Sequence, residues 1–220
     1  MIKLHDYLPS MNGYKVRMLL GLLGLHYEHV PVAIFRGESH VPGFLDKNPA
    51  GAVPVLEVAP QKYIAESNAI LCYLAEGSPF LPDEKFARAK CLQWLFFEQY
   101  NIEPNIGTLR YWTLTNRLAT SAAMVPAKRA AGERALDALE RHLQTHPLLA
   151  NDTFSIADIA VFAYTHLAEQ GGFKLSLRPA LQAWLKRVAG LPVGGIPEVF
   201  PYDPDASLPV GGSRTVIAPD

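Results

Sequence analysis

The chain has 220 residues, of which 49% are hydrophobic, and its 20 basic and 21 acidic residues leave a formal net charge of −1. This length and composition predict a globular protein of one or two domains with a substantial core. No basic run is present that would follow a phosphate backbone, so nucleic acid is not expected as a partner. The apolar stretch at 18–25 is too short to span a bilayer, and we expect neither a signal peptide nor a membrane span.

The first part of the chain alternates between strand and helix patterns. In chain order the predicted elements are strands at 2–7 and 26–33 with a helix at about 14–25 between them, a Gly/Pro-punctuated loop at 37–51, strands near 55–58 and 63–65, and a helix at about 67–76. This order predicts a small α/β domain over residues 1–77.

The pattern changes at about Asp83, after which strand signals disappear and the periodicity is helical to about residue 189. Leu136, Leu139 and Leu143, for example, recur at spacings of three and four. We therefore predict an all-helical domain over 84–190. The last 31 residues contain six prolines and five glycines, too many for a long regular element, so 191–220 is predicted to be a tail that wraps the surface or is loose.

One helix start in the second region is marked clearly by its sequence. Ser155 and Asp158 fit a capping box, and Phe154 and Ile159 occupy the hydrophobic positions on either side of it. Such a cap is typically worth about 1 kcal/mol. The pattern predicts a buried helix that organises the bundle, and we assign it no chemistry.

The cysteines and histidines offer little sign of metal or disulfide chemistry. Cys72 and Cys91 form no C-x-x-C motif and are expected to be small hydrophobic side chains, which favours the cytoplasm as the compartment. His142 and His146 have i,i+4 spacing but lack the acidic residue of H-E-x-x-H. No metal site is expected.

Residues 53–58 would form a continuous buried strand except that Pro54, which cannot donate a ladder hydrogen bond, stands among them. This proline belongs to one of four motifs that together resemble the glutathione transferase superfamily. The motifs are S-M-N-G-Y-K-V-R at 10–17, N-P-A-G-A-V-P at 48–54, E-S-N-A-I at 66–70 and S-I-A-D-I at 155–159. The resemblance extends to about residue 190. It implies an α/β thioredoxin-like N-terminal domain followed by an all-α helical-bundle domain.

The resemblance also implies a glutathione site. Thioredoxin-like domains carry a cis-proline before the third strand, and Val53-Pro54 falls there, so the Val53 backbone is expected to pair with the cysteinyl portion of glutathione. Ser67, at a helix N-terminus, suits the γ-glutamyl carboxylate, and Glu66 suits the neighbouring ammonium. His40 is either a contact to the glycyl carboxylate or an ordinary exposed histidine. The family's further polar position before the V-P is Ala52 here, which weakens the expected glycyl recognition.

Three residues compete for the role of thiolate donor. Ser-type members of the family place a serine in the loop before the first helix, which corresponds to Ser10. The same stretch resembles the T-P-N-G-x-K of bacterial members in which a Thr and an Asn share the role, which makes Asn12 a rival. Tyr-type members place their donor near Tyr7. All three also suit an ordinary turn or cap.

Acceptor substrates in this family bind between the domains. Met11, Tyr111 and Trp112 are apolar candidates, and Arg110 is a candidate for an anionic group, although residues at such spacing also serve as core or dimer contacts. We expect a homodimeric glutathione transferase that detoxifies a small electrophile, with glutathione as co-substrate. Two alternatives remain: a glutathione-dependent disulfide reductase or peroxidase, and a binding module without turnover.

Overall fold

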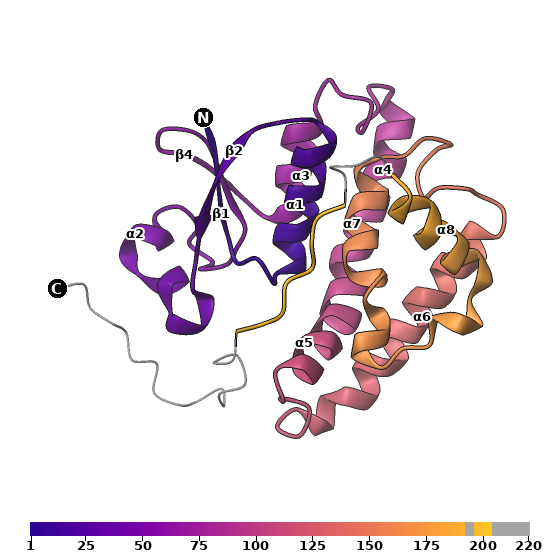
Figure 1. Ribbon diagram of the computed structural model, residues 1–220. Helices are drawn as coiled ribbons and strands as arrows, with labels where there is room; N and C mark the ends of the chain where they lie inside the picture. The colour runs from indigo at the N-terminus through magenta and orange to yellow at the C-terminus, as the bar shows by residue number, and fades with distance from the viewer. Residues whose placement is uncertain (192–195, 204–220) are drawn as a thin grey trace. The chain divides into compact units, whose positions relative to one another are not determined.

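The computed structural model describes residues 1–191 and 196–203. These residues form two compact units. Unit 1 comprises residues 1–74 together with the described residues from Pro197 onward, and unit 2 runs from Ala75 to Ile196 (Figure 1). Within the described ranges, the helices are all too short or too polar to cross a bilayer.

Unit 1 is built on a four-stranded sheet of order β2-β1-β3-β4. Its strands are β1 (Ile2–Asp6), β2 (Tyr27–Pro31), β3 (Val55–Ala59) and β4 (Lys62–Ala65). β1 runs parallel to β2 and antiparallel to β3, and β3 runs antiparallel to β4. The parallel pair needs a crossover, which helix α1 (Met11–Leu22) supplies. The predicted β-α-β start and β-β-α finish are therefore confirmed.

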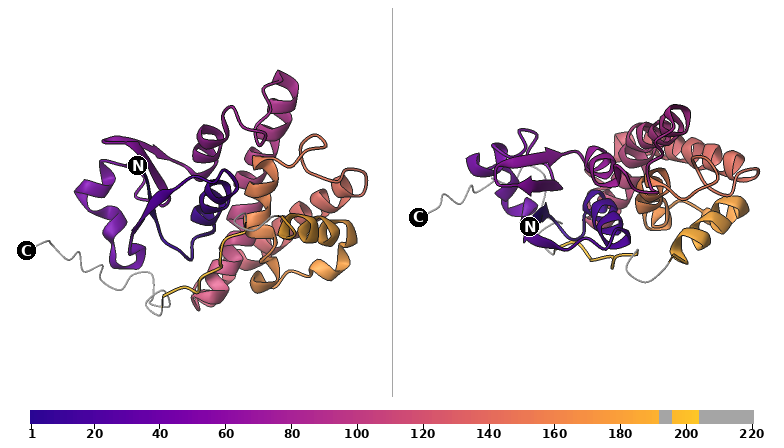
Figure 2. Two further views of the ribbon diagram at one scale, coloured as in Figure 1. Left: turned by 45° about the horizontal axis from the view of Figure 1, so that its top comes forward. Right: turned by 90° about the horizontal axis from the view of Figure 1, so that it is seen from above.

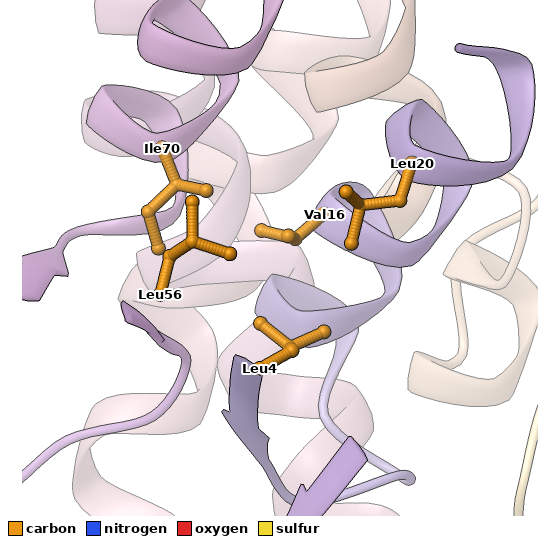
Figure 3. Close-up of a cluster of buried hydrophobic side chains, with 5 residues drawn as sticks. All are labelled: Leu4, Val16, Leu20, Leu56 and Ile70. Atoms are coloured by element: carbon orange, nitrogen blue, oxygen red, sulfur yellow. The ribbon is translucent and has the colours of Figure 1, made fainter. Parts of the chain in front are cut away.

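Two helices cover one face of this sheet. Side chains alternate between the two faces of a strand, and Leu4 of β1 and Leu56 of β3 point to this face (Figure 3). There they pack against Val16 and Leu20 of α1 and Ile70 of α3 (Ser67–Ala75). All five side chains are fully buried. Their packing fixes the positions of α1 and α3, whose N-termini carry predicted site residues.

The opposite face is covered by the segment between β2 and β3. This segment forms the short elements η1 (Ile34–Arg36), η2 (Glu38–His40) and α2 (Pro42–Leu45). Phe44 of α2 packs with Val32 and Val55 in a second buried cluster. The predicted Gly/Pro-rich loop is thus an ordered layer of short helical turns.

Among the described residues of unit 2, the regular elements are all helical, and they are joined by loops. Its helices are α4 (Lys85–Phe97), η3 (Glu98–Gly107), α5 (Thr108–Leu114), η4 (Ala122–Met124), α6 (Val125–Leu143), α7 (Ile156–Thr165), η5 (Ala168–Gly171), η6 (Leu175–Leu177) and α8 (Pro179–Ala189). From α4 to α5 the helix is continuous, with wide π turns over η3. Pro104 lies inside η3, and a proline, which has no N–H, is a usual reason for such an irregularity.

Helix α7 is the buried centre of unit 2, as its sequence predicts. It lies against α4 and α8 (Figures 1 and 2), and every one of its residues is buried. The capping box of Ser155 and Asp158 is present. Asp158 also accepts hydrogen bonds from the Leu149 backbone N–H at 3.1 Å and from the indole Nε1 of Trp184 at 2.9 Å. One carboxylate therefore ties the start of α7 to α8 and to the preceding loop.

Candidate active site

Three segments that carry predicted site residues leave the sheet at the same end. In the sheet register, His5 of β1 pairs with Val55, the first residue of β3, and Val55 pairs with Ala65, the last residue of β4. The loop after β1, the residues before β3 and the residues after β4 therefore start side by side. They carry Ser10 and Asn12, Val53 and Pro54, and Glu66 and Ser67, respectively.

Ser10 is the N-cap of α1. Its backbone is extended (φ −69°, ψ 127°), and its hydroxyl oxygen accepts a weak, 3.5 Å hydrogen bond from the Gly13 N–H. Because this contact uses only the oxygen as acceptor, the hydroxyl hydrogen can point toward another group. The cap also explains why α1 begins at Met11 rather than near Tyr14, where the apolar pattern alone would start it.

The loop that presents Ser10 is held by a buried ion pair. Arg17 of α1 donates one hydrogen bond to Asp6 at the end of β1 and another to the Leu8 carbonyl at 2.8 Å. Burial raises the pKa of Asp6 to about 6, although Arg17 opposes the rise. Gly13 is required here, because a Cβ at that position would lie 1.9 Å from Asp6 Oδ1. The ion pair thus fixes where the loop begins.

Asn12 belongs to a hydrogen-bonded network that joins α1 to α3. The Lys15 ammonium donates to Asn12 Oδ1 at 2.9 Å and to Ser67 Oγ at 3.3 Å. The Ser67 hydroxyl in turn donates to Asn12 Oδ1 at 3.2 Å. The structure therefore connects two residues that the sequence assigns to different parts of glutathione, Asn12 to the cysteinyl thiol and Ser67 to the γ-glutamyl carboxylate. Lys15 itself was missed by the sequence analysis, although it is the K of the quoted N-G-x-K pattern.

Glu66 and Ser67 form the start of α3. Glu66 is exposed and has a left-handed backbone (φ 65°), which is uncommon for a residue with a Cβ and marks a position worth functional attention. Its carbonyl accepts the first helical hydrogen bond, from the Ile70 N–H at 2.9 Å. Ser67 is buried at the first turn, where backbone N–H groups and the helix dipole favour an anion.

The Val53-Pro54 peptide bond is cis, which confirms the expectation from the resemblance. The loop before it is held by buried Asn48, whose side-chain amide donates to the Ala52 carbonyl at 2.8 Å. His40 is exposed at the end of η2, and a Cβ built on Gly51 would lie 3.1 Å from its Nε2. The His40 ring therefore lies beside the segment that leads to Val53.

Tyr7 is packed against the described part of the C-terminal segment. The Tyr7, Phe35 and Tyr202 rings form a cluster with centroids 5.6–6.3 Å apart. The Tyr7 hydroxyl accepts a hydrogen bond from the Asp203 N–H at 2.9 Å. Burial raises the pKa of Tyr7 well above its usual value, so the phenol keeps its proton. Tyr202 and Asp203 therefore pack on Tyr7 and Phe35, and the part of the predicted tail after Asp203 lies outside the described residues.

The acceptor candidates have different surroundings. Met11 is buried in unit 1. In α5 of unit 2, buried Arg110 donates from Nε to Gln170 at 2.7 Å, whereas Tyr111 and Trp112 are half-buried and lie under Arg117 and Lys128, respectively. The three neighbours on α5 thus contact three different partners, and Arg110 in particular has an established structural contact.

Neither cysteine forms a disulfide: Cys72 is half-buried, and Cys91 is buried, which raises the pKa of its thiol. The His142 and His146 rings stack at 4.2 Å. Among the described residues, no group of three or more His, Cys, Asp or Glu side chains is arranged to hold a metal ion.

The fold and site define a two-domain protein with a thioredoxin-like first domain and a helical second domain. The chain matches the glutathione S-transferase N-terminal domain over residues 1–76 and the glutathione S-transferase C-terminal domain over residues 78–192. It belongs to the glutathione S-transferase superfamily.

Known relatives within this superfamily differ in their named activities. The crystal structure of a possible glutathione S-transferase from Rhodopseudomonas palustris is 46% identical, with a TM-score of 0.86, over 90% of this chain and 97% of that one. A glutathione transferase family member from Pseudomonas fluorescens, solved with two glutathione molecules bound, is 28% identical (TM-score 0.76; 87% and 89% covered). The disulfide-bond oxidoreductase YfcG of Escherichia coli is 30% identical over 198 residues, 86% of this chain and 91% of its own.

Proposed function

We propose that this protein is a glutathione S-transferase that stabilises the thiolate of bound glutathione for attack on an electrophilic carbon of a small molecule. The observation that carries the proposal is the convergence of three segments, with Ser10, Val53 and Ser67, at one end of the sheet. The sulfur–carbon bond forms as the leaving group departs with its electron pair. Superfamily membership and the relative solved with glutathione support the same ligand.

Each end of glutathione has a proposed partner in unit 1. The Val53 backbone would pair with the cysteinyl portion in the manner of an added strand. At the start of α3, Ser67 would bind the carboxylate of the γ-glutamyl residue, and Glu66 would bind the ammonium of the same residue. His40 would contact the glycyl carboxylate, which its position beside Gly51 supports.

The thiol needs a hydrogen-bond donor to ionise at neutral pH. A thiol with a pKa near 8.5 requires about 2.7 kcal/mol of preferential anion stabilisation to lower that pKa by two units. We propose Ser10 as the principal donor, since its hydroxyl caps α1 and its hydrogen can point outward. Asn12 is the second donor. For the acceptor substrate we propose contacts within each unit separately: Met11 in unit 1, and Arg110, Tyr111 and Trp112 in unit 2.

Reduction of disulfides is the second candidate function. In this reaction the glutathione thiolate attacks one sulfur of a disulfide and releases the other sulfur as a thiolate. Two observations favour it: the hydrogen-bonded position of Asn12 in the N-G-Y-K sequence, and the similarity to a relative named as a disulfide-bond oxidoreductase.

A panel of three substrates tests the proposed function. The purified chain is assayed with glutathione and an aryl halide, an organic hydroperoxide, or a glutathione mixed disulfide. We expect turnover of the aryl halide to be fastest. Faster reduction of the disulfide or hydroperoxide would favour the second candidate, and glutathione binding without any turnover would indicate a binding module.

A further inference from the structure

Lys15 is a fully buried charged group beside the candidate site. Its side chain lies in α1 and is fully inaccessible to solvent. Moving an ammonium out of water is costly unless its protons find acceptors. The structure gives it Asn12 Oδ1 at 2.9 Å and Ser67 Oγ at 3.3 Å. The Lys15 ammonium therefore donates hydrogen bonds to two residues of the proposed glutathione site.

The contact with Lys15 sets the orientation of the Asn12 amide. An ammonium has only donors, so the Asn12 atom that faces it must be the carbonyl oxygen. The Ser67 hydroxyl donates to that same oxygen at 3.2 Å. The NH₂ group of Asn12, which is the part able to donate to a thiolate, is consequently directed to the other side of the amide.

The same charge acts on the Ser67 position. A carboxylate oxygen at hydrogen-bond distance from Ser67 Oγ would lie within about 6 Å of the Lys15 ammonium, since those two atoms are 3.3 Å apart. If the Ser67 hydroxyl donates its hydrogen bond to the carboxylate, it no longer donates to Asn12 Oδ1. The bond from Lys15 would then keep the amide oriented.

We propose that Lys15 is a positioning residue that couples the γ-glutamyl part of the site to the thiol part. Its positive charge favours binding of a carboxylate at Ser67, and its hydrogen bond holds the Asn12 amide in the orientation that can donate to the thiolate. The proposal rests on the proposed glutathione-binding function. It goes beyond that function because it assigns both glutathione affinity and thiol ionisation to one buried side chain. That side chain need not touch the reacting sulfur.

The test compares Lys15→Met with Lys15→Arg and with an exposed control, Lys62→Met on β4. Calorimetry measures glutathione affinity, and the ultraviolet absorbance of the bound thiolate is titrated against pH. We expect Lys15→Met to weaken binding about tenfold and to raise the pKa of the bound thiol. Lys15→Arg, which keeps the charge, should restore part of both effects, and Lys62→Met should change neither.

A double-mutant cycle separates positioning from a general loss of structure. In a Ser67→Ala background, Lys15→Met should cost less than threefold in affinity, because the shared partner is already gone. Full additivity, or unchanged affinity and titration in Lys15→Met, would overturn the proposal. If Lys15→Met does not fold, Lys15→Gln in the same cycle removes the charge but keeps a donor. Absence of glutathione binding by the wild type would instead refute the proposed function and this inference with it.

Discussion

At the scale of single residues, Ser10 and Asn12 make different contacts with the chain. Ser10 accepts only a weak helix-cap bond, whereas Asn12 Oδ1 accepts from both Lys15 and Ser67. The first arrangement leaves a hydroxyl hydrogen to be directed at a ligand, and the second fixes an amide. Either group can stabilise a thiolate, so the order of their effects decides which is the principal donor.

We predict that Ser10→Ala leaves glutathione affinity within about threefold but raises the pKa of the bound thiol toward its solution value, because the hydroxyl stabilises the anion more than the neutral thiol. Asn12→Ala should raise that pKa less. The measurement is the ultraviolet titration of bound thiolate in both variants. An unchanged titration in Ser10→Ala would remove Ser10 from the mechanism.

His166 gives a prediction for the pH dependence of stability. Burial, with the nearby positive charge of Arg110, lowers the pKa of His166 from 6.5 to about 4, while its bond to the Phe162 carbonyl opposes the shift. Between these two pH values the unfolded chain takes up a proton and the folded chain does not, so this residue removes stability as the pH falls.

We expect His166→Asn to lose less stability than the wild type between pH 7 and pH 5, since the variant has no proton to gain at this position. Urea unfolding at both pH values measures the difference. The exposed His146, replaced in the same way, serves as the control. If the free energy of unfolding changes equally with pH in the wild type and in His166→Asn, this histidine does not cause the loss of stability.

At the scale of elements, α7 organises unit 2 through its N-terminus. We predict that Ser155→Ala costs about 1 kcal/mol, the usual value of a cap. Asp158→Ala should cost about 3 kcal/mol or more, because several buried donors, among them the Trp184 indole, lose their acceptor. Urea unfolding gives both values, with exposed Asp152→Ala as the control. Equal costs for Ser155→Ala and Asp158→Ala would mean that Asp158 acts only as a cap.

The elements also show where sequence patterns succeed and where they stop. The order of strands and helices, the cis peptide at Pro54 and the capping box of α7 were all predicted, since each depends on local residues or on a motif. The burial of Lys15 was not, because a lysine in a helix normally faces solvent and its partner Ser67 is 52 positions away. The π turns of η3 were missed for a different reason. One internal proline does not specify how the helix will accommodate it.

At the scale of the whole molecule, we propose a homodimer. Relatives in the family that the sequence resembles pair two chains, and several exposed large aromatic side chains are candidates for such an interface. They are Tyr73 (53% exposed), Phe86 (70%), Phe96 (73%) and Tyr100 (81%). Sedimentation at micromolar concentration should give twice the chain mass, and Phe96→Glu should weaken the association. A wild-type monomer under these conditions would rule the homodimer out.

The central claim, that this chain binds glutathione at the start of α3, is tested most directly by calorimetry of the double variant Glu66→Ala/Ser67→Ala. Each change removes a proposed charge-assisted contact worth about 1.5–3 kcal/mol. We expect glutathione to bind the wild type and to bind the double variant at least tenfold more weakly, while exposed Glu28→Ala on β2 keeps the wild-type affinity. Equal affinities for the wild type and the double variant would contradict it.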